Sequence, residues 1–236
     1  MANVKTAGSD RVPLGQKAAF GAGHLVLNLY PGALGFFMFF LLTAFGMDPF
    51  LAGLLGGLPR FFDAVTDPIM GFVSDNTSSK WGRRRPYIFV GGILSAITFV
   101  LLWQLDENNS SDYNFWYFLI MSMVFLIGNT MFATPLVGLG YEMTSDYNER
   151  TRLMAFSQTV GLLAWVIVPW FWVIIADPDF FSNQAEGVRT MAIYVGIACF
   201  LLGLLPAIFC RGMDSANMGN RKKLTFTSIF SNLKDL

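Results

Sequence analysis

An arginine and two aspartates, Arg60, Asp63 and Asp67, interrupt an apolar stretch that runs from about residue 50 to residue 73. Their spacings of three, four and seven residues place the three side chains on one face of a helix. An unpaired charge in the middle of an apolar membrane helix is strongly unfavourable, so these residues need compensating partners. Arg60 is the expected charge partner of one aspartate, which leaves the other carboxylate available for Na⁺ or a proton.

The alternative is a purely structural role, in which Arg60 neutralises an aspartate and helps to hold helices together. One arginine cannot compensate two carboxylates, and a spare buried carboxylate is what an ion site requires. The pattern therefore favours a cation site at Asp63 and Asp67, with Na⁺ as a possible metal ion.

Membrane helices are the elements that must position these residues. The chain is 54% apolar and 14% charged, with 24 Phe and 12 Met, a balance that a soluble domain of this length could not hide from water. A helix crosses a bilayer with about 20 residues, and six apolar stretches are long enough: 18–43, 50–73, 87–103, 115–139, 154–176 and 191–210. We predict an all-α membrane protein with a six-helix transmembrane bundle over residues 18–210.

The basic residues predict the orientation of this bundle. Of the 16 Lys and Arg residues, 14 lie before the first stretch, after the sixth, or in the loops that follow the second and fourth. By the positive-inside rule both termini are cytoplasmic, which suits a multi-pass protein of the plasma (inner) membrane. Residues 1–17 then form a cytoplasmic segment, and residues 211–236 form a cytoplasmic linker. In this linker Phe226, Ile229, Phe230 and Leu233 have the spacing of an amphipathic helix on the membrane surface.

A loop between the second and third stretches carries the next informative pattern. Gly71 and Asp75 are followed by Gly82 and by three arginines, Arg83, Arg84 and Arg85, just before Pro86. This pattern resembles the cytoplasmic signature loop of the major facilitator superfamily. The resemblance implies that the acid and the arginines hold helix ends together and release them as a transporter changes state.

The stretch from Pro59 to Gly71, read with the Gly82 to Pro86 run, is similar to the glycoside-pentoside-hexuronide:cation symporters, the family of the melibiose permease. Two further matches are the stretch from Thr130 to Pro135 and the stretch that begins at Glu142 and includes Asp146 and Arg150. The resemblance implies a cation site at Asp63, Thr66, Asp67 and Thr130. It also implies a cytoplasmic gate formed by Gly71, Asp75, Gly82, Arg83, Arg84, Arg85, Glu142, Asp146 and Arg150.

Four positions depart from that family's pattern, one near the cation site and three near the substrate. Thr66 stands where the melibiose permease has asparagine, so the coupling ion can be Na⁺ or H⁺. Thr134 offers a further hydroxyl group nearby. The sugar-binding acid of the first helix is replaced by His24, the acid before Pro135 by Ala133, and the fifth-helix arginine by Gln158. We expect substrate contacts from His24, Asn28 and Gln158, and galactoside specificity is in doubt.

Three tryptophans of the fifth stretch, Trp165, Trp170 and Trp172, have two possible roles. An indole ring can stack on a sugar ring, or it can sit at the membrane interface or against lipid. The two cysteines, Cys199 and Cys210, lie eleven residues apart on one predicted helix, about 16 Å along its axis. That separation excludes a disulfide between them, so both are predicted packing residues.

Members of the resembled family have twelve helices in two halves, each half built from three-plus-three helix repeats. This chain corresponds to the amino-terminal half, and we expect cation-coupled symport, by Na⁺ or H⁺, of a sugar or glycoside. The expected partners are the lipid bilayer and a second six-helix half, from the same or another chain, and no nucleic acid. The alternatives are a non-transporting or half-size membrane module, and a carrier of lysolipids. No HExxH, GxSxG or nucleotide-binding loop occurs, so neither an enzyme nor a cofactor is expected.

Overall fold

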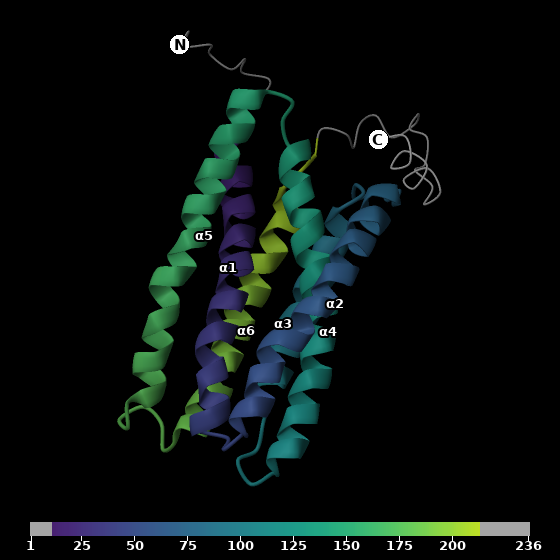
Figure 1. Ribbon diagram of the computed structural model, residues 1–236. Helices are drawn as coiled ribbons and strands as arrows, with labels where there is room; N and C mark the ends of the chain where they lie inside the picture. Colours follow the sequence, from purple (N-terminus) through teal and green to yellow (C-terminus); the bar gives the residue numbers. More distant parts are fainter. Residues whose placement is uncertain (1–10, 213–236) are drawn as a thin grey trace.

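The computed structural model describes residues 11–212, and they form a bundle of six α-helices joined by short turns. Both ends of the chain emerge at the same end of this bundle, called the terminal end below (Figure 1). The helices are α1 (Leu14–Thr43), α2 (Pro49–Asn76), α3 (Arg85–Leu102), α4 (Ser111–Glu142), α5 (Tyr147–Ala176) and α6 (Gln184–Phe209). The predicted amphipathic helix around Phe226 to Leu233 lies outside the described residues.

Five of these helices, α1, α3, α4, α5 and α6, are long and apolar enough to cross a membrane. The remaining one, α2, has 28 residues, but Arg60, Asp63 and Asp67 interrupt its apolar run. The structure therefore supports an integral membrane protein with several spans. The charged side chains that point to a site are the same ones that make α2 different.

Polar residues outside the apolar runs explain why the helices are longer than the predicted spans. Asp48 caps α2 by accepting a hydrogen bond from the backbone N–H of Phe50 at 2.9 Å, and Pro49 follows at the first helical position. Asp146 and Asn183 cap α5 and α6, each accepting a backbone N–H at 2.7 Å. The first helix, α1, begins at Leu14, which lies inside the predicted cytoplasmic segment 1–17.

The helices pack as neighbours in a specific pattern: α3 against α4 and α6, α1 against α5 and α6, and α2 chiefly against α4. Small residues allow the closest approach, because a Cβ atom on Gly91 of α3 would lie 2.5 Å from the backbone nitrogen of Phe132 in α4. Aromatic side chains such as Tyr30, Phe99 and Phe125 fill the buried centre in edge-on or tilted contacts. Only four residues of α2 are buried, so most of that helix faces outward.

Arginines tie α3 to α6 at both ends of the bundle. At the terminal end, Arg85 donates from Nε to the carbonyl of Ala207 at 2.6 Å and from Nη2 to that of Ile208 at 2.7 Å. At the opposite end, Arg189 of α6 donates from Nε to the carbonyl of Leu105, just after α3, at 2.6 Å. These bonds satisfy carbonyl groups that a helix end or a turn leaves free.

Candidate functional site

Asp67 of α2 meets two hydroxyl groups from α4. Thr130, which is buried, donates to Oδ1 of Asp67 at 2.9 Å, and Thr134 donates to the same oxygen at 3.5 Å. The two threonines lie one turn apart on α4, which explains why both reach one carboxylate. The structure thus brings Asp67 and Thr130 together across two helices and adds Thr134 beside them.

Asp63 lies one turn from Asp67 and is only partly compensated. Nη1 of Arg60 is 3.8 Å from Oδ2 of Asp63, and the Arg60 side chain is 75% exposed, so this ion pair is long and loose. Oδ1 of Asp63 is buried and accepts no hydrogen bond from any of the described residues. A buried carboxylate oxygen without a partner is costly, and binding a proton or a cation removes that cost.

Thr66 lies between the two aspartates in sequence, but its hydroxyl is used within its own helix. It donates to the carbonyl oxygen of Phe62 at 3.1 Å and approaches that of Asp63 at 3.4 Å. Such a back-bonded threonine keeps an oxygen lone pair for a cation but no proton to donate. The two carboxylates with neighbouring hydroxyls form a small oxygen-rich site suited to a hard cation or to a proton. Over residues 11–212 no group of three His, Cys, Asp or Glu side chains suited to a metal ion occurs, so the hydroxyls of the threonines would have to complete a site for Na⁺.

A second polar group lies along the seam where α1 packs against α5. His24 is only 8% exposed, its ring packs edge-on against Phe20, and its Nε2 has no hydrogen-bond partner among residues 11–212. Asn28 donates from Nδ2 to the carbonyl of His24 at 2.9 Å. Gln158 of α5 is exposed and is a hydrogen-bonding neighbour of the His24 side chain. The structure therefore places all three predicted substrate residues on one seam.

Glycine makes this seam tight. A Cβ atom on Gly161 of α5 would lie 2.7 Å from Nδ2 of Asn28 and 3.0 Å from the carbonyl oxygen of His24. The indole Nε1 of Trp165, one turn further along α5, donates to Oδ1 of Asn28 at 3.3 Å. Both polar atoms of the Asn28 amide are therefore engaged inside the protein.

At the terminal end, Arg84 joins three helices. It forms an ion pair with Asp75 at the end of α2, and its Nε lies 2.6 Å from Oε1 of Glu142 at the end of α4. Arg83 donates from Nε to the same glutamate oxygen at 3.0 Å. Gly82 has a φ of +95°, a left-handed conformation that favours glycine and turns the chain into these arginines.

Other predicted gate residues make further contacts. Arg85 binds the end of α6, as described above, and Arg150 donates to the carbonyl of Thr144 at 3.0 Å. Asp146 caps α5, and Gly71 lies in α2 next to Thr134 and thus near the cation site. Of the predicted gate residues, Asp75, Arg83, Arg84 and Glu142 thus share one cluster at the terminal end.

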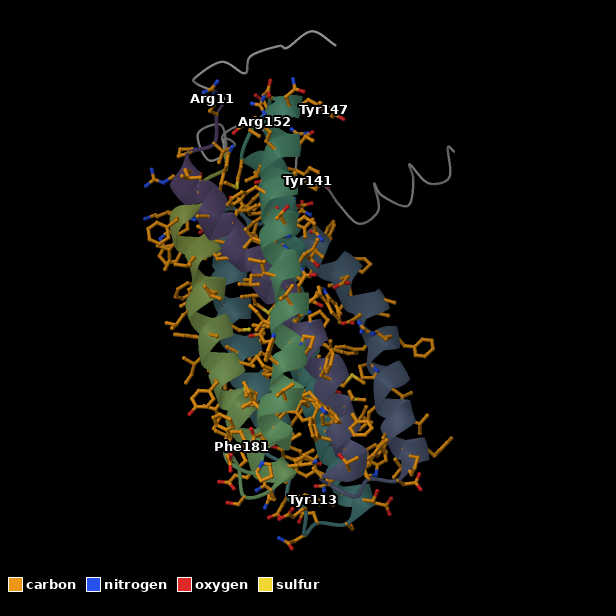
Figure 2. All side chains as sticks on the ribbon, turned by 90° about the vertical axis from the view of Figure 1, so that its left-hand side faces the viewer. Arg11, Tyr113, Tyr141, Tyr147, Arg152 and Phe181 are labelled. Atoms are coloured by element: carbon orange, nitrogen blue, oxygen red, sulfur yellow. The ribbon has the colours of Figure 1, made fainter. Side chains whose placement is uncertain are left out.

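Glu149 is an interaction centre that the sequence analysis does not single out. Its side chain is 2% exposed, accepts from Nζ of Lys17 at 2.6 Å and from the backbone N–H of Val12 at 3.1 Å, and lies 3.6 Å from Arg152. It fixes the start of α1 to the start of α5. An acid among the basic residues of the segment around Arg150 and Arg152 is the sequence signal for it. Figure 2 shows Arg152 and Tyr147 at the terminal end, with Tyr113 and Phe181 at the opposite end.

Comparison with known proteins adds a family. A family model described as MFS/sugar transport protein matches residues 19–235. An uncharacterized symporter of Synechocystis is 30% identical over 205 residues, which cover 84% of this chain and 38% of the relative. The sodium-dependent lysophosphatidylcholine symporter 1 of Gallus gallus is 29% identical over 67% of this chain and 30% of its own length. An uncharacterized symporter of Bacillus subtilis is 25% identical over 95% of this chain and 49% of its own length. The chain thus spans half or less of the length of these relatives.

Proposed function

Because this chain belongs to the MFS/sugar transport protein family and resembles its symporters, we propose that it forms the amino-terminal part of a cation-coupled symporter for a sugar or a related solute. The observation that carries the proposal is the carboxylate pair of α2. Asp63 has a buried oxygen without a partner, and Asp67 holds two hydroxyls of α4 on one oxygen.

The coupling ion, Na⁺ or H⁺, binds between these two carboxylates in the proposed mechanism. Its charge compensates the carboxylate that the distant Arg60 leaves uncompensated, so the site is stable in the membrane only when it is loaded. Because Thr130 and Thr134 belong to α4, loading also draws α2 and α4 together. An ion that favours one packing of two helices biases a conformational equilibrium, which is the physical basis of coupling.

We further propose that α2 also crosses the membrane, which brings the number of spans to six, and that both termini face the cytoplasm. The Arg60 side chain is 75% exposed and that of Asp63 is 22% exposed, and charged groups that face lipid are unfavourable. A second six-helix half would cover these side chains, and the greater length of the relatives supports this partner. Substrate would bind between the halves, as in transporters built from repeats, here three plus three helices per half.

The Asp75–Arg84–Glu142 cluster acts as a cytoplasmic latch in this scheme. It connects the ends of α2, α3 and α4 by charge-assisted bonds, which are short and strong but can be exchanged for other partners. Because it lies at the end of the bundle, it controls which state the transporter adopts and does not contact substrate.

A lysolipid is the second candidate substrate. The lysophosphatidylcholine symporters among the relatives favour it. Large apolar side chains of α5, such as Leu162 and Val166, are exposed beside the seam between α1 and α5 and suit an acyl chain. A half-size or non-transporting membrane module is a third possibility, but it gives no reason to retain Asp63 and Asp67.

The test is a cation-binding measurement on the purified chain in lipid nanodiscs, which needs no knowledge of the substrate. Calorimetric titration with NaCl against choline chloride, and proton uptake followed with a pH-indicating dye, report the two candidate ions. Asp63→Asn and Asp67→Asn should each abolish binding of the coupling ion, whereas Asp112→Asn, an exposed acid at the start of α4, should not change it. Unaltered Na⁺ and proton binding in both α2 variants would rule out the assigned site.

A further inference from the structure

We propose that Trp165 is the surface on which the substrate stacks and that Asn28 is a positioning residue that holds this indole in place. The inference rests on the proposed transport function and deepens it, because it assigns different roles to residues of the same seam. The sequence pattern places Asn28 among the substrate ligands, whereas the geometry directs its amide elsewhere.

Both polar atoms of the Asn28 amide already form a hydrogen bond inside the protein. Nδ2 donates to the carbonyl oxygen of His24 at 2.9 Å, which fixes the amide plane against α1. This leaves Oδ1 pointing to α5, where it accepts from Nε1 of Trp165 at 3.3 Å. A hydrogen bond at the edge of an indole fixes the direction of the ring.

Trp165 differs from the other tryptophans of α5 in its contacts. Its side chain is 49% exposed although its N–H is bound, so a large part of the ring remains available. Trp172 stacks on Phe40 with ring centroids 4.9 Å apart, so one face of its ring is used inside the bundle. Trp170 is 62% exposed. It lies more than one turn beyond Trp165 on α5 and on a different face of that helix. Trp165 therefore combines an exposed ring with an orientation fixed by a hydrogen bond.

The neighbours of Trp165 indicate the chemistry of its ligand. Gln158 lies seven residues earlier on α5, which is two helical turns and hence the same face. Across the seam, His24 is more than nine-tenths buried and keeps Nε2 without a partner among the described residues. An aromatic face beside neutral hydrogen-bonding groups suits a pyranoside, whose C–H face stacks on the indole while its hydroxyls bind His24 and Gln158. A quaternary ammonium would also bind an indole face, but it would leave those polar groups unused.

The first experiment tests the orientation of the indole without any ligand. In the purified chain in nanodiscs, the emission of Trp165 is obtained as the difference between the wild-type chain and Trp165→Phe. Asn28→Leu removes the acceptor, and Asn28→Asp retains an acceptor oxygen at the same position. We expect the Trp165 emission to shift in Asn28→Leu and to stay close to wild type in Asn28→Asp. An unchanged emission in Asn28→Leu would show that Asn28 does not orient the ring.

The second experiment measures ligand binding, with melibiose as the sugar probe and lysophosphatidylcholine as the competing candidate. Trp165→Leu and Asn28→Leu should each weaken melibiose binding by about tenfold or more, which corresponds to about 1.4 kcal/mol. Asn28→Asp should restore most of the affinity, and Trp170→Leu, the matched control, should leave it unchanged.

The remaining outcomes separate this inference from the proposed function. If the wild-type chain binds Na⁺ or protons through Asp63 and Asp67 but binds no melibiose, cation coupling stands and the stacking role for a pyranoside is overturned. If lysophosphatidylcholine binds in a Trp165-dependent manner and melibiose does not, the ring binds a different ligand class, and the pyranoside assignment is overturned. If melibiose binds with equal affinity to wild type and Trp165→Leu, Trp165 is not the stacking surface.

Discussion

The guanidinium group of Arg84 lies directly over the backbone of Gly138, on the turn of α4 before Glu142. A methyl group at position 138 would overlap Nη1 of Arg84, so the Asp75–Arg84–Glu142 latch requires glycine there. The obstacle is the far end of a flexible side chain, and that side chain can move. Replacement of Gly138 is therefore expected to displace the arginine without preventing the helices from packing.

Gly138→Ala should consequently have the same effect as Arg84→Ala. Charged hydrogen bonds contribute about 1.5–3 kcal/mol each, so either variant should lower the free energy of unfolding by an amount in that range and unfold at a lower temperature. The double variant should be no less stable than Arg84→Ala alone, because both changes remove the same contacts. Thermal unfolding in detergent measures this. Gly35→Ala in α1, where a methyl group meets no atom within 4 Å, is the control, and additive losses in the double variant would contradict the shared contact.

The two hydroxyls on Asp67 should differ in importance. Thr130 donates from a buried position at 2.9 Å, whereas the Thr134 oxygen is 3.5 Å away and less well placed. Thr130→Val should therefore weaken binding of the coupling ion by about tenfold or more. Thr134→Val should weaken it by less than about threefold. Calorimetric titration with NaCl checks both values, and the reverse order would show that Thr134 is the principal hydroxyl of the site.

Glu149 should be important for stability and not for ion binding. Its Lys17 partner is partly buried at 2.6 Å, so removing the acid leaves a poorly solvated ammonium group. Glu149→Gln should lower the free energy of unfolding by about 1–3 kcal/mol. The exposed Arg152, 3.6 Å from the same carboxylate, provides the comparison, because Arg152→Ala should cost less than about 1 kcal/mol. A double-mutant cycle between Lys17 and Glu149 that gives no coupling would exclude the role of this pair.

Cys210 should react slowly with thiol reagents and with a distinctive pH dependence. It follows the last residue of α6, its Sγ donates to the carbonyl of Gln16, and burial raises the pKa of its thiol from 9.0 to about 12. Only the thiolate reacts, so the rate should continue to rise with pH beyond 9 as the folded-state pKa is approached. In a Cys199→Ser background, a maleimide labelling series over pH measures this rate. A rate that levels off near pH 9, as for an exposed cysteine, would contradict the burial.

The sequence predicts the helices well because apolar runs of this length have few alternatives in a membrane. The helical period predicts that Asp63 and Asp67 share a face of one helix, whereas Thr130 enters the predicted site only through the family resemblance, and in the structure it donates to Asp67. The described structure adds Thr134 to this site as a second hydroxyl on Asp67. Cys199 and Cys210 are both buried, as expected for packing residues.

What the sequence does not predict depends on contacts between helices far apart in the chain. The role of Glu149 depends on Lys17 and Val12, more than 130 positions earlier, and no local pattern reveals that pairing. The separation of Arg85 from Arg84 has the same origin, because adjacent residues at a helix start point in different directions and meet different partners. The engagement of both Asn28 amide atoms likewise follows from the close approach that Gly161 permits.

The arginine contacts that join α3 to α6 at opposite ends of the bundle make the distance between these two helices a reference for spectroscopy. Two helices held by Arg85 at one end and by Arg189 at the other cannot slide past each other without breaking both sets of bonds, and they cannot separate at either end without breaking the set there. Spin labels placed on the outward faces of α3 and α6 should therefore report one narrow distance in every state of the protein. Labels on α2, which has few buried residues to restrain it, can then be measured against that constant reference.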